Sequence, residues 1–384
     1  MTGRERLMRT FRRQPVDRVA VAPFLYYNNV YEMFGYEPNI DTFFDPPDFD
    51  PIVKFVEYCA HFGFDALHTL GSAWAAAYAF SMDRSGENWD VHVEREGTHD
   101  SQRRTTTIRT PGGELRQVQN FQRTSRHLVV SAIGEYLIKT REDFEILALY
   151  APPVGKVDCS LVRRAKEAIG EAGMTVANIH GAFNTLNMFR KLDDLMADPV
   201  EDEGFYRAMM EYFLERTILQ NRQIVEAGTD VIEMAANTAT SGVGPRFFER
   251  FVLEYENRVA REIRRAGAFS ILHNCGDAVK IMHLYNQLDI DVWGYLTGPP
   301  FGDMDLDKAL EVMRPDLVLR GNIDQVKFLV DASPEEIRAR VGALLEKVKP
   351  RGNWILSTTD FFMDGVPYRN IEAFADAGRE FGVY

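Results

Sequence analysis

The sequence SPEEIRARVGALLEKVKPRGNWILSTT, residues 333–359, predicts one helix followed by one strand. Ser333 is a favourable N-cap, Pro334 occupies the first helical position, and Glu336 completes a capping box. Apolar residues then recur on one face at helical spacing: Ile337, Val341, Leu344, Leu345 and Val348. The run at 354–359 is typical of a parallel strand that is covered on both faces.

Upstream of this unit, further strand-like runs occur, with helical patterns between them. Together with residues 354–359 they make eight, the others being 19–24, 65–70, 175–180, 230–235, 269–274, 291–296 and 317–322. Eight strand–helix units predict an α/β fold of the (β/α)₈ TIM barrel type. An open doubly wound sheet is the main alternative, but no Gly-rich phosphate-binding fingerprint follows any of the strands to favour it.

Residues 88–134 interrupt this alternation. They contain TTTIRTPGGELRQVQNF (105–121), two alternating runs around Pro111-Gly112-Gly113. This pattern predicts a β-hairpin or small sheet inserted after the second barrel strand, and we expect it to lean over the barrel mouth. Neither a repeat of fixed period nor a Ser- or Gly-rich linker is present, so residues 1–384 are expected to form a single barrel domain with this insertion.

Composition restricts the class of protein. A chain of 384 residues with 45% hydrophobic residues can bury a large core, and its net charge of −13 argues against nucleic acid. The apolar run at 72–80 is too short to span a membrane, and the Arg-rich N-terminus lacks a signal peptide's apolar region. We expect the first helix to present a solvated face. Three scattered cysteines predict no disulfide framework and favour a cytoplasmic location.

In such barrels the chemistry gathers at the C-terminal ends of the strands. Titratable, amide and aromatic side chains recur there, and water or a ligand must satisfy the polar ones. They are Tyr26, Tyr27, Asn28, Asn29, His68, His180, Glu233, Asn237, His273, Cys275, Tyr295, Asn322, Asp324, Thr359 and Asp360. The C-terminal mouth is therefore the predicted site.

His273 and Cys275, in ILHNCGD (271–277), form the pair with the clearest chemical meaning. Residues i and i+2 of an extended chain point to the same side, so the imidazole and the thiolate can face one point. Such a pair suits Zn²⁺, and a catalytic zinc needs a third protein ligand, for which Asp360 and Glu233 are available. The alternative is structural: a buried small cysteine and salt-bridged carboxylates.

Several longer segments carry a resemblance to a known family. They are RERLMRTFRRQPVDRVAVAPF (4–24), GAFNTLNMFRKLDDLMADP (181–199), the fourth-strand region EAGTDVIEMAANTATSGVGPRFFERFVLEYENRV (226–259), ILHNCGD, LRGNIDQ (319–325) and GVPYRNIEAF (365–374). Through these segments nearly the whole chain resembles the uroporphyrinogen decarboxylase superfamily and, within it, the cobalamin-linked methyltransferase branch. The resemblance implies a (β/α)₈ barrel with its site at the C-terminal mouth, and ILHNCGD looks like the zinc motif of the methyltransferases.

Two departures from the family pattern refine the expected activity. FLYYNN (24–29) stands where the decarboxylase has an Arg-rich substrate signature, so porphyrinogen decarboxylation is not expected. Methyltransferases that alkylate thiols have a second zinc cysteine after the last strand, where this chain has Asp360. A carboxylate donates less charge to zinc than a thiolate does, which leaves the ion a stronger Lewis acid. From this stronger Lewis acidity we hypothesise that the enzyme acts on a methyl group bound to oxygen, as in the O-demethylation of an aryl methyl ether.

The resemblance also implies roles for residues and partners. His273, Cys275 and Asp360 would bind the metal, and the catalytic candidates are His180, Tyr295 and Glu233. The candidates for substrate binding are Phe24, Tyr26, Asn28, Asn237, Asn322 and Asp324. A separate corrinoid protein would supply the cobalamin, because nothing in the chain resembles a cobalamin-binding domain; a homodimer is also expected.

Two other functions stay open at this stage. A metal-independent decarboxylase or other lyase on the same fold would keep its activity in the presence of chelators. A non-catalytic small-molecule binder would bind its ligand without turnover.

Overall fold

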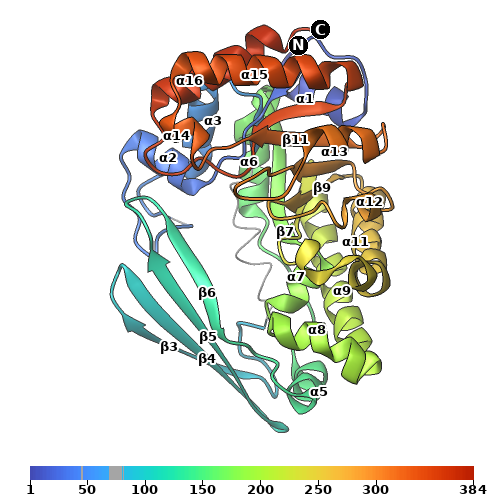
Figure 1. Cartoon of the computed structure of the whole chain (residues 1–384). Coiled ribbons are helices and arrows are strands. Elements are labelled where there is room, and N and C mark those ends of the chain that lie inside the picture. Colours follow the sequence, from blue (N-terminus) through green and yellow to red (C-terminus); the bar gives the residue numbers. More distant parts are fainter. Residues whose placement is uncertain (45, 69–79, 81) are drawn as a thin grey trace.

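The computed structural model describes residues 1–44, 46–68, 80 and 82–384, and it contains one curled sheet of eight parallel strands with helices around it (Figure 1). The order of the strands in the sheet is β1-β12-β11-β10-β9-β8-β7-β2, the sequential order of a (β/α)₈ barrel. Their bounds are β1 Ala20–Val21, β2 Ala66–His68, β7 Gly173–His180, β8 Val231–Ala235, β9 Phe269–Asn274, β10 Val292–Tyr295, β11 Val318–Ile323 and β12 Trp354–Thr358. The predicted fold class and barrel strands are confirmed, except for residues 69–70 of the second strand, which lie outside the described residues.

Helices cover the outside of this sheet (Figure 1). They are α1 Gly3–Phe11, α2 Tyr27–Phe34, α3 Pro51–Phe62, α5 Arg141–Tyr150, α6 Ser160–Ile169, α7 Ala182–Asn187, α8 Leu192–Glu201, α9 Glu203–Glu226, α10 Pro245–Phe247, α11 Leu253–Ala266, α12 Met282–Tyr285, α13 Leu306–Val312, α14 Phe328–Asp331, α15 Pro334–Val348 and α16 Tyr368–Phe381. α15 begins with the predicted capping box, in which Ser333 and Glu336 satisfy each other's backbone N–H groups.

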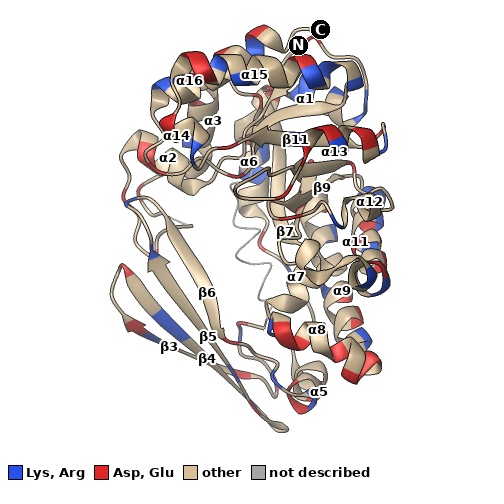
Figure 2. Cartoon of the chain, viewed as in Figure 1, with Lys and Arg blue, Asp and Glu red and all other residues tan. Residues whose placement is uncertain are grey.

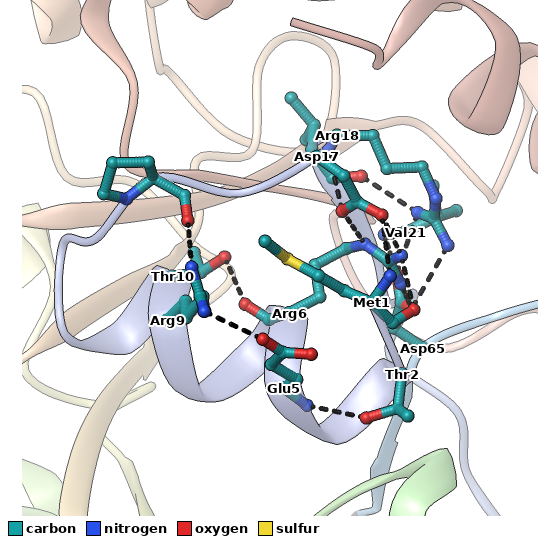
Figure 3. Close-up of polar contacts among 12 residues, drawn as sticks. Met1, Thr2, Glu5, Arg6, Arg9, Thr10, Asp17, Arg18, Val21 and Asp65 are labelled. Carbon is teal, nitrogen blue, oxygen red and sulfur yellow. Dashed lines mark hydrogen bonds and ion pairs between the residues drawn. The ribbon is translucent and has the colours of Figure 1, made fainter.

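The two edge strands of the sheet, β1 and β2, meet at Asp65. The backbone N–H of Asp65 donates to Val21 O at 2.9 Å, and the Asp65 carboxylate accepts from Val21 N at 2.9 Å. The same carboxylate pairs with Arg6 and Arg18 (Figure 3). These contacts lie at the N-terminal ends of the strands, so they hold the barrel together on the face opposite the predicted site.

Helix α1 closes that N-terminal face. Leu7 and Phe11 are fully buried and pack in one cluster with inward-facing strand residues, including Val231 and Ile355. The expectation that this Arg-rich helix presents a solvated face is wrong for Arg6, which is 5% exposed. Arg6 is buried because its guanidinium pairs with Asp17 and Asp65, which offset the loss of hydration (Figure 3).

The insertion is larger than one hairpin. It forms a four-stranded antiparallel sheet in the order β3-β4-β5-β6, with bounds Asp90–Gly97, Ser101–Thr110, Gly113–Arg123 and Val129–Glu135. The predicted turn at Pro111-Gly112-Gly113 joins β4 to β5. Figure 1 shows this sheet beside the barrel, and Figure 2 shows that charged residues lie mainly on the outer helices and on parts of this sheet.

Two expectations fall partly on residues 69–79, which lie outside the described residues. The end of the second predicted strand and most of the apolar run at 72–80 belong to this group, and the side chain of His68 is also not described. Among the described parts of the chain, we find no helix that is both long and apolar enough to cross a membrane.

Candidate active site

A cavity of about 300 Å³ lies at the C-terminal ends of the barrel strands. Barrel residues form one side of it and the inserted sheet forms the other, so the insertion does cover the mouth as expected. The lining residues are Phe24, Tyr26, Tyr27, Phe44, Phe121, Leu128, Val129, Val130, Ser131, Asn178, His180, Ala235, Asn237, His273, Asp360 and Phe361.

Three of the predicted metal ligands come together at this cavity. One ligand atom each from His273, Cys275 and Asp360 lies within 4.8 Å of the other two. His273 is the second-last residue of β9, and Cys275 directly follows that strand. Asp360 lies two residues after the end of β12. Segments that are far apart in the sequence therefore converge here.

Glu233 lies behind His273, and its carboxylate has no exposed surface. Glu233 Oε1 is 2.6 Å from His273 Nδ1, and both carboxylate oxygens accept from the Tyr295 hydroxyl, at 3.1 and 3.2 Å. Arg320 Nη1 approaches Glu233 Oε2 at 3.4 Å and donates to the Tyr295 hydroxyl oxygen at 2.5 Å. Glu233 is thus a buried anion that accepts from His273, Tyr295 and Arg320, and also from Asn178.

This arrangement sets the orientation of the imidazole. Because Nδ1 of His273 is taken by Glu233, Nε2 is the nitrogen that can face a ligand, and it is buried with no hydrogen-bond partner among the described residues. A carboxylate that accepts from the second nitrogen of a metal-bound histidine is a common outer contact in metal sites. Glu233 therefore orients His273 in the structure and is not one of the three clustered groups.

The protonation of the cluster reflects burial and neighbouring charge. Burial acts to lower the pKa of His273, but the hydrogen bond to Glu233 and the nearby Cys275 and Glu233 outweigh it and raise that pKa to about 10. Burial raises the pKa of Asp360, and the cationic form of His273 opposes this shift. Burial alone would raise the pKa of Glu233, yet hydrogen bonding to His273 lowers it below its usual value.

The donor set fits zinc. An imidazole nitrogen, a thiolate and a carboxylate oxygen are all ordinary zinc ligands, and atoms bound to one tetrahedral zinc lie roughly 3.5 Å apart. In the cluster, the three ligand atoms all lie within 4.8 Å of one another. The buried Nε2 of His273, which has no partner in the described chain, is the atom that a metal would satisfy.

Aromatic rings form the wall beside the metal candidates. The ring of Phe24 lies edge-on to the imidazole of His273, with centroids 5.2 Å apart, and it contacts the ring of Phe361 at 6.1 Å. Tyr26 and Phe361 are 5.3 Å apart. From the insertion, Phe121 and Val129 also line the cavity. The space next to the metal candidates is therefore largely apolar.

Two other predicted residues, His180 and Asn237, also line the cavity. Burial lowers the pKa of His180 to about 3, so its imidazole is neutral at pH 7 and can form hydrogen bonds without carrying charge. Asn237 Oδ1 lies 3.7 Å from Cys275 Sγ and accepts a hydrogen bond from it.

Four predicted site residues lie elsewhere. Tyr295 is fully buried behind Glu233, and Asn28 in α2 donates to Phe362 O and to Asp364, so it anchors the loop after β12. Asn322 and Asp324 border a second cavity and not this one. This placement does not support substrate binding in the main cavity by Asn28, Asn322 or Asp324, and Tyr295 does not reach it.

Two polar residues of the site were absent from the predicted set. Arg320 lies on β11 with no exposed surface, and Asn178 lies on β7 two residues before His180, on the same side of the strand. Asn178 Nδ2 donates to Glu233 Oε1 at 3.4 Å. A charged or amide side chain inside an otherwise apolar strand run is the signal that identifies both residues.

Comparisons with known proteins agree with this geometry. A family model described as uroporphyrinogen decarboxylase (URO-D) matches residues 128–381. A methylcobamide:CoM methyltransferase of Methanosarcina mazei is 19% identical over 99% of this chain and 98% of its own length; one of Methanosarcina acetivorans is 20% identical with the same coverage. A solved structure, "methyltransferase from Methanosarcina mazei", superposes with a TM-score of 0.71 at 17% identity and covers 99% of each chain. The last comparison supports the fold alone.

Proposed function

The chain belongs to the uroporphyrinogen decarboxylase family, and from this premise we propose that it is a methyltransferase that moves a methyl group between a small methylated substrate and a separate corrinoid protein. The whole-length relatives, named as methylcobamide:CoM methyltransferases, support the corrinoid link. A cobalamin carried by the partner would exchange the methyl group. A metal-free lyase is the alternative, and it gives no role to the His273 cluster.

One observation carries the proposal: a histidine, a cysteine and an aspartate converge beside an apolar cavity, and Nε2 of the histidine is buried without a partner among the described residues. His273, Cys275 and Asp360 would hold a zinc ion. When bound, that ion supplies Lewis acidity toward an ether or alcohol oxygen.

The remaining site residues have roles that follow from their positions. Glu233 fixes the ring of His273 with Nε2 toward the cavity. Phe24, Tyr26 and Phe361 exclude water and present ring faces and edges to an apolar group of the substrate. The neutral His180 offers a hydrogen bond to the substrate, since its low pKa makes it a poor reservoir of protons at pH 7.

The substrate class follows from Asp360 and the aromatic wall. An oxygen donor in place of a thiolate leaves a bound zinc ion more electron-poor, which favours polarisation of a bound oxygen over activation of a thiol. The cavity of about 300 Å³ is at the small end of ligand pockets. We therefore favour O-demethylation of a small aryl methyl ether. A cytoplasmic location is part of this proposal, because all three cysteines are free; the homodimer stays a prediction.

The test combines metal analysis with a methyl-transfer assay. Protein purified under reducing, zinc-replete conditions is expected to contain one zinc per chain. It should convert cob(I)alamin and a methoxybenzoate into methylcobalamin and the hydroxybenzoate, whose leaving oxygen takes up a proton. His273→Ala and Cys275→Ser are expected to lose the zinc and to lower the rate roughly 100-fold or more, since Lewis acidity contributes several kcal/mol to such reactions. Cys159→Ser, at the start of α6, is the matched control and should change neither quantity.

The variant Asp360→Cys tests the choice of substrate. It should retain zinc through three protein ligands, while activity shifts from the aryl methyl ether toward a thiol or thioether. Wild-type protein without bound metal, or methyl transfer that survives chelators, would contradict the metal role. Equal activity of wild type and Asp360→Cys on the ether would contradict the oxygen preference.

A further inference from the structure

A second cavity, of about 310 Å³, adjoins the metal candidates. It lies at the ends of β10, β11 and β12, on the same face of the barrel as the main cavity. Thr359 lines the second cavity, and its neighbour Asp360 lines the first. One short segment therefore separates the two cavities, and a large flat molecule that covers one would reach the other with its edge.

Three polar groups border the second cavity without partners in the described chain. Asn322 donates through Nδ2 to Leu296 O at 3.3 Å, which leaves Oδ1 as a buried acceptor with no donor. Thr297 Oγ1 is also buried and has no hydrogen bond among the described residues. The guanidinium of Arg340, an exposed residue of α15, lines the cavity and forms no ion pair with any described carboxylate, so it is available to a ligand.

The nearby acid, Asp324, is already satisfied. Its Oδ1 accepts from the backbone N–H groups of Val326 and Lys327, at 2.7 and 3.1 Å, and its Oδ2 accepts from that of Phe328 at 3.1 Å. The Asp324 carboxylate therefore caps the segment that leads into α14. It does not supply the missing partner of Arg340.

The rim of the cavity is apolar. Phe301 is 46% exposed and lines the cavity together with Phe328 on α14. Met304 and Leu306 complete the apolar part of the wall. The ligand that fits this cavity combines an apolar edge with a group that both donates and accepts hydrogen bonds.

A primary carboxamide meets these demands. Its carbonyl oxygen accepts from Arg340 and Thr297, and its NH₂ group donates to Asn322 Oδ1. A carboxylate lacks the donor, and an ammonium group lacks the acceptor. Primary carboxamides on short alkyl arms surround the rim of a corrin ring.

We propose that the second cavity receives a peripheral carboxamide of the partner's corrin ring while the cobalt faces the main cavity. This inference rests on the proposed function. Phe301 and Phe328 then pack against the apolar edge of the ring. The cavity sets the position of the corrin relative to the metal candidates, and it favours cobamides over corrins whose side chains carry no N–H donors.

The test compares the binding of two free corrins to the purified protein by absorbance titration: cobinamide, which carries the carboxamides, and cobyrinic acid heptamethyl ester, which has none. Wild type should bind cobinamide roughly tenfold more tightly, as expected for the one additional hydrogen bond from the amide N–H. Asn322→Ala should remove most of this preference because it removes the Oδ1 acceptor, whereas Arg340→Met and Thr297→Val should weaken the binding of both corrins because an ester carbonyl accepts there too. Arg338→Met, on the same helix as Arg340 but paired with Glu380 outside the cavity, should leave the preference and the affinity unchanged.

Competition with propionamide, a small primary amide, distinguishes a site for the corrin from a site for amides in general. Excess propionamide should weaken cobinamide binding to wild type but not to Arg340→Met. Equal binding of the two corrins to wild type, or a preference that persists in Asn322→Ala, overturns the inference. Propionamide binding without cobinamide binding assigns the cavity to small amides and overturns the corrin assignment. His273→Ala should lose methyl transfer and keep the carboxamide preference, so failure of the proposed function remains distinguishable.

Discussion

Glu233 and His273 show how two buried side chains determine which ring nitrogen faces the cavity. The carboxylate accepts from Nδ1, and it is held in turn by Tyr295 and Arg320. Replacing Glu233 by Gln removes the negative charge behind the ring and makes Nε2 a weaker donor to a metal. We predict that zinc affinity falls roughly 10- to 100-fold in Glu233→Gln, measured by competition with a chromophoric chelator.

Tyr295→Phe is the matched control for this prediction. It removes one hydrogen bond to Glu233 but keeps the carboxylate, so zinc affinity should change much less. Circular dichroism and thermal melting should accompany both variants, because Glu233→Gln also leaves the charge of Arg320 without its buried partner. Unchanged zinc affinity in a folded Glu233→Gln protein would show that the carboxylate does not support the metal.

At the opposite, N-terminal end of the barrel, Asp65 is another buried carboxylate that holds its neighbours in place through hydrogen bonds and ion pairs. It pairs with Arg6 and Arg18 and accepts from the backbone of Val21 (Figure 3). In Asp65→Ala, Arg6 keeps only its pair with Asp17 and remains buried. We predict a loss of roughly 3–5 kcal/mol in the free energy of unfolding, measured by urea denaturation. Glu5→Ala removes an exposed i,i+4 ion pair with Arg9 on the same helix. It should lower the free energy of unfolding by less than about 0.5 kcal/mol.

At the scale of elements, the segment after β7 is fixed in place by a side chain from helix α11, which is distant in the sequence. Glu256 on α11 accepts from Ala182 N and Phe183 N, both at 3.0 Å, and so caps the start of α7 directly after His180. Gly181 makes room for this carboxylate, because a Cβ at that position would overlap with Glu256 Oε2. Burial raises the pKa of Glu256 to about 7, although both backbone hydrogen bonds oppose the shift.

This raised pKa predicts a pH-dependent stability. Between the ordinary glutamate pKa of 4.5 and the folded value of about 7, the unfolded chain loses the Glu256 proton while the folded chain keeps it. The contribution of Glu256 to stability therefore falls as pH rises through this window, by roughly 3 kcal/mol in total. Glu256→Gln mimics the protonated form. Between pH 4.5 and pH 8 its free energy of unfolding, measured by urea denaturation, should rise by about that much relative to wild type.

The matched control is Glu254→Gln, an exposed position on the same helix with an ion pair to Arg261. Its stability relative to wild type should stay nearly constant over the same pH range. A difference between Glu256→Gln and wild type that does not change with pH would mean that the carboxyl group titrates normally in the folded protein.

The elements themselves were largely predictable from local patterns. Ser333 and Glu336 determine the start of α15 through short-range hydrogen bonds, and the barrel strands are recognised because both of their faces are buried. The size of the insertion was less predictable. The clear turn at Pro111-Gly112-Gly113 indicates only the β4–β5 hairpin. β3 is polar, β6 is largely apolar in composition, and both are mostly exposed, so their pairing depends on their neighbours.

The site shows the same division between local and long-range information. The i, i+2 spacing predicted that His273 and Cys275 lie close together, and the position of Asp360 at a strand end predicted that it lies near them; the structure groups all three. Asn28 was misplaced because the chain after β1 forms helix α2, which turns this amide toward Phe362 O. Arg320 was missed because it lies inside β11, whereas the prediction placed functional residues at the strand ends.

At the scale of the whole molecule, the inserted sheet is attached to the barrel at Asp364. Its carboxylate accepts from Ser125 Oγ and from His127 N in the loop between β5 and β6. It also accepts from Asn28 Nδ2 at 2.9 Å, on the barrel side. Asp364 thus joins the insertion, the first helix after β1 and the loop that contains Asp360 and Phe361.

Loss of this junction should release the insertion from the barrel without unfolding either part. In Asp364→Ala, three hydrogen bonds disappear, and we predict that hydrogen exchange in residues 121–131 accelerates roughly 10- to 100-fold. Exchange in β9 and β11 should not change, because their ladders do not involve the insertion. The measurement is hydrogen–deuterium exchange followed by mass spectrometry of the intact variant.

Glu114→Ala provides the comparison, since Glu114 is an exposed acid on the same sheet that pairs only with Arg109 among the described residues. It should leave exchange in residues 121–131 unchanged. In the methyl-transfer assay, Asp364→Ala should raise KM for the methoxybenzoate more than it lowers kcat, because the insertion supplies apolar wall and not metal ligands. A fall in kcat alone, with normal exchange, would mean that Asp364 acts on the metal ligand Asp360 through their shared loop and does not fasten the insertion.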